Sequence, residues 1–311
     1  MPDHAVQDVV ARPHALLAGL RLRQWIKNLL VVTAPLAAGV LDQRDVVLRT
    51  LLAFVCFCAC ASAVYLLNDV VDAEADRRHP VKRFRPVASG ALRPATALTT
   101  AAVLAVAALS ASWALGTGGL AVVLASYLAA SAWYCLQAKH IAVVELAVVA
   151  SGFVLRAAAG GIAAGLPISR WFLIVASFGS LLVASGKRYS ELVGAPPDDA
   201  PDLDLDAPAA RVTRPVLAAY TPQYLRFVWT MSAAVCATAY CLWAFEVAET
   251  AGGTPWAALS VAPFVVALLR YALDVDHGRA QEPERIVLTD RVLQALALAW
   301  VVTFAVGAVH A

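Results

Sequence analysis

The chain has 311 residues, of which 61% are hydrophobic and only 15% are charged, and its mean hydropathy is +0.71. A soluble domain carries roughly 25% charged residues, so the composition excludes an ordinary soluble enzyme, a disordered chain and a coiled coil. The formal net charge of +2 says little, because the positions of the charges matter more, and we expect no nucleic-acid partner. We predict an all-α, polytopic membrane protein with a single transmembrane domain over residues 1–311.

A membrane-crossing helix needs about 20 mostly apolar residues. Hydropathy predicts nine spans, of which the first and sixth are short for a full crossing. In chain order the predicted spans are 26–41, 50–67, 97–115, 119–137, 141–164, 171–186, 225–247, 255–273 and 288–309. The first 20 residues are mixed and polar, so no cleavable signal peptide is expected.

The six cysteines lie inside apolar stretches, where free cysteines behave as small buried hydrophobes. Small residues follow one another in the fifth span, and such runs permit close helix packing. The cysteines are Cys56, Cys58, Cys60, Cys135, Cys236 and Cys241. The small residues are Ala157, Ala158, Ala159, Gly160, Gly161, Ala163 and Ala164.

The distribution of positive charge predicts the orientation. With the N-terminus in the cytoplasm, 20 of the 24 Lys and Arg residues fall on cytoplasmic segments and three on external ones, as the positive-inside rule requires. We therefore expect a protein of the inner (plasma) membrane with its C-terminus outside. The long charged loops 68–96, 187–224 and 274–287 then share the cytoplasmic side. A transporter usually has its polar groups at mid-membrane, so this pattern favours an enzyme with a cytoplasmic mouth.

The segment after the second span is rich in carboxylates and reads NDVVDAEAD over residues 68–76. If the helix continues past Leu67, then Asn68, Asp72 and Asp76 spread over only about 80° of its circumference, and Asp69 lies beside them. Crowded carboxylates repel one another on a helix. A magnesium ion removes this conflict, because it takes oxygen ligands and links carboxylates to substrate phosphates.

A basic run follows the carboxylates and supplies partners for phosphate groups. It consists of Arg77, Arg78, Lys82, Arg83 and Arg85. Carboxylates beside arginines are the composition of a magnesium–diphosphate site, and the alternative is a solvated helix end capped by mixed charges. His79 precedes Pro80, and this position favours a role in shaping the turn over a role in catalysis.

The NDxxDxxxD pattern after the second span resembles the first aspartate-rich motif of the UbiA-type intramembrane prenyltransferases, and the predicted topology is similar over nearly the whole chain. That resemblance implies nine helices around a central cavity with a polar cytoplasmic cap. It also implies magnesium-dependent transfer of a prenyl group from its diphosphate. These are expectations for the present chain.

The second aspartate-rich motif of that family is absent. The loop after the sixth span instead begins SGKRYSEL over residues 185–192. Lys187 and Arg188 attract an additional phosphate group rather than a second metal ion, so the ligand should carry phosphates at more than one position. A later acidic run is interleaved with Pro and Ala, and we interpret it as a solvated loop. It comprises Asp198, Asp199, Asp202, Asp204 and Asp206.

Three sequence features together resemble the phosphoribosyltransferase branch of this superfamily. They are RQWIKN at 23–28, DRRHPVKRFRP at 76–86 and GKRYSE at 186–191. The resemblance implies that phosphoribosyl diphosphate (PRPP) is the soluble donor and that a long polyprenyl monophosphate, decaprenyl phosphate, is the acceptor in the lipid bilayer. The implied product is a precursor of the arabinose donor for cell-wall arabinan.

The resemblance assigns roles to individual residues. Asn68, Asp69, Asp72 and Asp76 would hold Mg²⁺ on the leaving diphosphate, with Asp72 and Asp76 as direct ligands. The candidates for donor phosphates are Lys82, Arg83 and Arg85. Lys187, Arg188 and Tyr189 form a second catalytic group for the 5-phosphate or the ribose. Glu191 would bind a ribose hydroxyl or order Arg188.

Other polar residues have two interpretations each. Lys27 and Asn28 either anchor the interface or bind phosphate, and Tyr134 and Lys139 are further substrate-binding candidates. Arg156 is costly inside a helix, so it either binds a phosphate or pairs within the protein. Glu145 lies three turns before Arg156, too far for a direct pair in one straight helix. The loop from Asp274 to Asp290 is a candidate for closing the site or holding a second metal.

Two competing functions remain. A prenyltransferase acting on an aromatic acceptor would need the second aspartate-rich motif, which is missing. A lipid or solute transporter would place ionisable residues in several spans, and only Arg156, Glu145 and Glu246 approach that description. The length of the polyprenyl tail, the number of metal ions and a homo-oligomer are left open by the residues.

Overall fold

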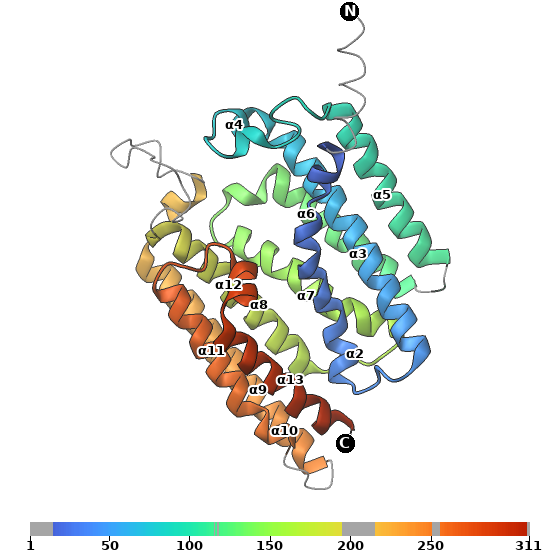
Figure 1. Cartoon of the computed structure of the whole chain (residues 1–311), viewed down its shortest axis with the longest axis vertical. Coiled ribbons are helices and arrows are strands. Elements are labelled where there is room, and N and C mark those ends of the chain that lie inside the picture. The colour runs from blue at the N-terminus through green and yellow to red at the C-terminus, as the bar shows by residue number, and fades with distance from the viewer. Residues whose placement is uncertain (1–14, 115, 117, 195–214, 251–255, 310–311) are drawn as a thin grey trace, which may run out of the picture. The chain divides into compact units, whose positions relative to one another are not determined.

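The computed structural model describes residues 15–114, 116, 118–194, 215–250 and 256–309, and in this part of the chain it contains helices and no strand (Figure 1). The 3₁₀ segments are η1 (Leu22–Val32), η2 (Lys82–Phe84), η3 (Ala138–His140) and η5 (Pro215–Ala219). The α-helices are α2 (Thr33–Ala37), α3 (Arg44–Val71), α4 (Ala73–Arg77), α5 (Pro94–Ala114), α6 (Gly118–Leu136), α7 (Val144–Ala164), α8 (Arg170–Val193), α9 (Pro222–Thr250), α10 (Trp256–Leu259), α11 (Val261–Asp276), α12 (Pro283–Thr289) and α13 (Arg291–Val309).

Among the described helices, α3, α5, α6, α7, α9 and the pair α10–α11 are long and apolar enough to cross a membrane. The pair α12–α13, bent by 84°, is a seventh candidate. The predicted first span falls on η1 and α2, and the sixth falls on α8, whose last turns carry Lys187, Arg188 and Glu191. The prediction of an all-α membrane protein is confirmed, whereas the count of nine spans and the cytoplasmic cap stay predictions.

The helices form two compact units. The first unit comprises Met1–Pro35, Leu41–Ala138 and Leu155–Pro167. The second unit comprises Leu36–Val40, Lys139–Val154 and Ile168–Ala311, so α7 contributes to both. The prediction of one domain over residues 1–311 stays a prediction.

In the first unit, α3 packs against α5, α6 and η1. Phe57 of α3 and Leu120 and Leu124 of α6 are fully buried at the centre of this packing. Cys56 and Cys60 of α3 pack there as small hydrophobes, and all six cysteines of the chain are free thiols, as predicted. Apolar packing of long helices therefore supports the polar groups at their ends.

The small-residue run in α7 allows a close approach to η1. A Cβ on Gly160 would lie 1.9 Å from the carbonyl oxygen of Val31. Because that atom belongs to the backbone, no side-chain rotation relieves the clash. The expected packing role of this run is thus confirmed at Gly160.

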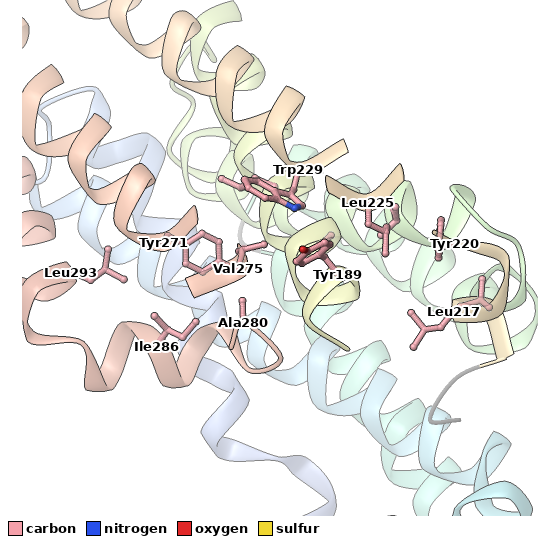
Figure 2. Close-up of a cluster of buried hydrophobic side chains, with 14 residues drawn as sticks. Tyr189, Leu217, Tyr220, Leu225, Trp229, Tyr271, Val275, Ala280, Ile286 and Leu293 are labelled. Atoms are coloured by element: carbon pink, nitrogen blue, oxygen red, sulfur yellow. The ribbon is translucent and has the colours of Figure 1, made fainter. Parts of the chain in front are cut away.

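In the second unit, α8 pairs with α9, and α11 packs against α8, α9 and α13. Figure 2 shows the buried cluster that joins them, with Tyr189 of α8, Trp229 of α9 and Tyr271 and Val275 of α11. A Cβ on Gly186 would lie 2.8 Å from a Val275 methyl group. The end of α8 is also tied to the following loop, because Ser190 Oγ accepts a 3.1 Å hydrogen bond from the Ala280 amide. This cluster holds the GKRYSE segment on α8 in place.

Replacing Gly160 by Ala should lower stability by about 1–3 kcal/mol, the usual cost of overpacking a close contact. Unfolding can be followed in detergent with a thiol-reactive dye, since five of the six free cysteines are buried. Gly118→Ala is the matched control, because its Cβ would meet only a Trp113 ring carbon, at 3.8 Å. Equal melting temperatures for the two variants would contradict the close approach.

Candidate active site

The carboxylate motif lies where α3 ends. The helix continues past Leu67 but is interrupted once: α3 ends at Val71 and α4 begins at Ala73, with Asp72 between them. The backbone nevertheless keeps the helical hydrogen-bond spacing, because Asp72 N–H donates to Asn68 O (2.9 Å) and Asp76 N–H to Asp72 O (2.8 Å). The expected grouping of these residues on one face therefore survives the break.

Two of the carboxylates are buried and bound by arginines. Asp69 is 1% exposed and accepts from the Arg21 guanidinium. Arg85 Nη1 lies 2.7 Å from Asp76 Oδ2 and 3.6 Å from Asp69 Oδ1, so one guanidinium links both acids. The sequence suggested phosphate as the partner of Arg85, whereas here it neutralises carboxylates. A charge removed from water costs several kcal/mol unless it is paired in this way.

Arg21 was not identified as a site residue from the sequence. It counted only as one of the positive charges on the cytoplasmic side, and 48 positions separate it from Asp69. Its backbone has φ +52°, a left-handed conformation that residues other than glycine rarely adopt. Its ring contact with Tyr65 (5.1 Å) and its bond to Asp69 hold the guanidinium over the motif.

The oxygen donors of the motif fit a magnesium ion. Among the described residues no group of three or more His, Cys, Asp and Glu side chains is arranged to hold a metal. Mg²⁺ does not need such a group, because it commonly uses one or two protein carboxylates and takes its other ligands from substrate phosphates and water. Asp69 Oδ2 is buried and accepts no hydrogen bond, and Asp76 shares a guanidinium with Asp69. A carboxylate oxygen with unused lone pairs is such a donor.

The basic run after the motif divides into two parts. Arg77 and Arg78 both bond to Glu74, at 2.9 Å each, and these hydrogen bonds lower the pKa of the Glu74 carboxyl. Lys82 and Arg83 belong to η2, and Arg83 lies over the ring of Phe84 at 4.8 Å. The first pair is therefore bound to Glu74 of α4, and η2 carries Lys82 and Arg83, which the sequence assigned to donor phosphates.

His79 shapes the turn between α4 and η2. Its Nδ1 accepts hydrogen bonds from the backbone amides of Val81 (3.2 Å) and Lys82 (3.3 Å). Burial, and next the charge of Lys82, lower the pKa of the imidazole below its ordinary value. Both observations agree with the structural role that the sequence favoured for His79.

The turn should weaken on acidification. Protonated Nδ1 cannot accept the two amide bonds, and the folded-state pKa lies below the unfolded value of about 6.5. The stabilisation is therefore fully present above about pH 6.5 and is lost as the pH falls through the folded pKa. A titration of histidine-labelled protein by NMR, with His79→Gln to assign the signal, measures this pKa. A value at or above 6.5 would contradict the acceptor role.

Arg156 is buried in the first unit beside neutral polar groups. Its Nε donates to Asn28 Oδ1 and its Nη2 to the Tyr127 hydroxyl, both at 2.8 Å, and Tyr127 also presents its ring face at 4.6 Å. Asn28 Nδ2 in turn contacts Cys58 Sγ at 3.2 Å. Tyr127 was not identified from the sequence, because it is a single aromatic residue within an apolar helix.

The other candidates lie at the ends of elements. Lys27 is a half-buried residue of η1, one position before Asn28. Tyr134 belongs to the last turn of α6 in the first unit, and Lys139 lies in η3 and belongs to the second unit. Their substrate-binding roles stay predictions. The acidic run at 198–206 lies outside the described residues.

In the second unit, Arg188 is the centre of a buried ion cluster. Its Nε and Nη2 bond to the two carboxylate oxygens of Glu145, at 2.8 and 2.7 Å, and its Nη1 bonds to Glu191 at 2.9 Å. Arg188 is 3% exposed and Glu145 fully buried. Lys187 is more open and lies 4.0 Å from Glu191. These contacts match the alternative in which Glu191 orders Arg188.

Tyr189 is linked to the end of α11. Arg226 donates to the Tyr189 hydroxyl at 2.6 Å and pairs with Asp276 at 3.1 Å. The expected loop from Asp274 to Asp290 is partly helical, because α11 runs to Asp276 and α12 covers Pro283–Thr289. Asp274 pairs with Arg279 at 2.8 Å, and Asp290 pairs with Arg270 at 2.8 Å. These three acids are thus bound to arginines, and their suggested roles in closure or metal binding stay predictions. Arg226 was not identified from the sequence, where it lies at the start of an apolar helix.

Glu145→Gln should destabilise the protein by about 3–5 kcal/mol, because removing one partner of a buried ion pair leaves the other charge uncompensated. Glu191→Gln should destabilise the protein less, because the Glu191 side chain is partly exposed and its loss leaves both hydrogen bonds between Arg188 and Glu145 intact. Thermal unfolding followed by thiol labelling compares the two variants. A larger loss for Glu191→Gln would show that the pair with Glu145 is not the main one.

The sequence profile of the UbiA prenyltransferase family matches residues 29–297. The chain belongs to this family, and its apolar helices make it an integral membrane protein.

Two curated relatives are close in sequence and length. A protein of Mycobacterium tuberculosis (strain ATCC 25618 / H37Rv) is 50% identical over 306 residues, covering 96% of this chain and 97% of the relative. A protein of Mycolicibacterium smegmatis is 48% identical over 312 residues, covering 96% and 94%. Both are named decaprenyl-phosphate phosphoribosyltransferase.

A solved structure confirms the fold. The UbiA homolog from Archaeoglobus fulgidus bound to GPP and Mg²⁺ matches with a TM-score of 0.68 over 96% of this chain and 100% of that one. At 15% sequence identity the likeness concerns the fold alone.

Proposed function

We propose that this protein transfers the 5-phosphoribosyl group of PRPP to decaprenyl phosphate and releases diphosphate. The observation that carries the proposal is the 50% identity, over 96% of the chain, to a relative named for this activity. The basic GKRYSE segment agrees with it, because cations stand where a transferase of prenyl diphosphates would need a second acidic motif. The proposed product is a precursor for cell-wall arabinan.

The carboxylate motif suits a magnesium-dependent reaction. Asn68, Asp69, Asp72 and Asp76 would hold Mg²⁺, which when bound neutralises the charge that grows on the leaving diphosphate. The related fold of the Archaeoglobus protein was solved with Mg²⁺, which supports a divalent cofactor in the family. Asp69 and Asp76 lie against Arg21 and Arg85, so these arginines also orient the carboxylates.

The bond changes occur at the anomeric carbon of the ribose. The bond from C1 to the diphosphate oxygen breaks, the diphosphate leaves with the electron pair, and an oxygen of the lipid phosphate forms the new C1–O bond. A phosphate monoester is already anionic near pH 7, so no strong general base is required. Lys82 and Arg83 of η2 are the proposed contacts for the donor phosphates.

The residues of the GKRYSE segment on α8 have different proposed roles. We assign Lys187 and Tyr189 to the 5-phosphate or the ribose, whereas the buried Arg188 orients its neighbours through Glu145 and Glu191. Lys27, Asn28, Arg156, Tyr134 and Lys139 are the remaining candidates for phosphate binding. The proposed location is the inner membrane, with the N-terminus and the PRPP-binding groups on the cytoplasmic side and the C-terminus outside.

Purified protein with Mg²⁺, ribose-labelled PRPP and decaprenyl phosphate should move label into the organic phase. Asp72→Ala and Lys187→Ala should each lower the rate by at least about 100-fold, since groups that stabilise transition-state charge contribute on that scale. The label should also stay in the aqueous phase when Mg²⁺ is chelated.

Asp45→Asn is the matched control for loss of a helical aspartate, because Asp45 lies at the opposite end of α3 in an exposed pair with Arg49. It should keep the parent rate. Folded protein that moves no label, yet transfers a prenyl group from its diphosphate to an aromatic acceptor, would refute the proposed reaction.

A further inference from the structure

Val143 has a backbone conformation that its side chain does not favour. It stands at φ +68° between η3 and α7. The left-handed region is rarely occupied by residues other than glycine, and a β-branched residue there is an outlier. Such conformations persist only where the surrounding structure holds them, and they gather at functional sites.

The hydroxyl of Tyr220 holds this turn. It accepts a 2.6 Å hydrogen bond from the Val143 amide, across 77 positions of sequence. Tyr220 is itself buried just after η5, in the cluster that includes Leu217 and Leu225 (Figure 2). Burial raises the pKa of its hydroxyl above the ordinary value, so it stays neutral under physiological conditions. The hydroxyl therefore supports the Val143 amide in the same way across the pH range near neutrality.

The turn sets the start of α7, and α7 carries the partner of Arg188. The carbonyl oxygen of Val143 accepts a 3.1 Å hydrogen bond from the Ala147 amide, so Val143 takes part in the first helical turn of α7. Glu145 is in that turn, and its two carboxylate oxygens are aligned with two nitrogens of Arg188. A change in direction at Val143 would turn this carboxylate away from the guanidinium.

We propose that Tyr220 is a positioning residue for the GKRYSE segment. By supporting the left-handed turn at Val143, it directs Glu145 onto Arg188 and thereby orients Lys187 and Tyr189 on either side of it. The effect on PRPP rests on the proposed function. The effect on the turn does not, because every contact involved lies within the second unit.

Tyr220→Phe removes the hydroxyl and keeps the ring. It should raise KM for PRPP about three- to tenfold, the effect of losing one hydrogen bond, and should change kcat and KM for decaprenyl phosphate less. The matched control is Tyr224→Phe, the same change on the neighbouring ring that stacks on Tyr220 at 6.0 Å. The control should keep the KM of the parent protein.

A double-mutant cycle separates positioning from general destabilisation. Glycine adopts positive φ without a steric penalty, so the turn in Val143→Gly no longer needs the hydroxyl. Tyr220→Phe should then raise KM for PRPP less than about twofold in the Val143→Gly background, where independent effects would multiply in full. A full-size increase in that background, or a loss of kcat with unchanged KM, would overturn the proposal.

Hydrogen exchange tests the turn without substrate. Amides of residues 143–147 should exchange about three- to tenfold faster in Tyr220→Phe than in Tyr224→Phe, because the opening equilibrium loses the same hydrogen bond. If the parent protein transfers no label from PRPP but this difference is found, the proposed function fails and the positioning role stands. Equal exchange in the two variants overturns the positioning role, whatever the activity.

Discussion

The architecture depends on pairing charges that are buried at the ends of apolar helices. Asp69, Glu145 and Arg188 are each at most 3% exposed, and an isolated ion in such surroundings costs several kcal/mol. Each is bound by a partner of opposite charge from another part of the chain: Asp69 by Arg21, and Glu145 by Arg188. The apolar helices can carry these buried acids and bases only because the pairs form.

The two units place opposite charges at the centres of their clusters. In the first unit, Asp69 and Asp76 lie at the centre and are bound by Arg21 and Arg85. In the second unit, an arginine lies at the centre between two glutamates, and Lys187 stands beside it. The two clusters therefore compensate their buried charges with the roles of acid and base exchanged.

Several expectations from the sequence were met for identifiable reasons. The three polar residues at intervals of four share a face, because the backbone hydrogen bonds continue through the break at Asp72. Gly160 makes the close helix contact that its small neighbours suggested. The helix continues past Leu67, as that spacing requires, but α3 ends at Val71 and α4 begins only after Asp72.

The class of the protein, the positions of most apolar helices and the acidic and basic motifs could be predicted from the sequence, because hydropathy and helical spacing are local properties. The pairing of the buried charges became visible only in the folded chain. Asp69 and Arg21 are 48 positions apart, Glu145 and Arg188 are 43 apart, and Tyr220 supports Val143 across 77 positions. No local pattern encodes these pairs, because they follow from how long helices pack and where their ends then lie.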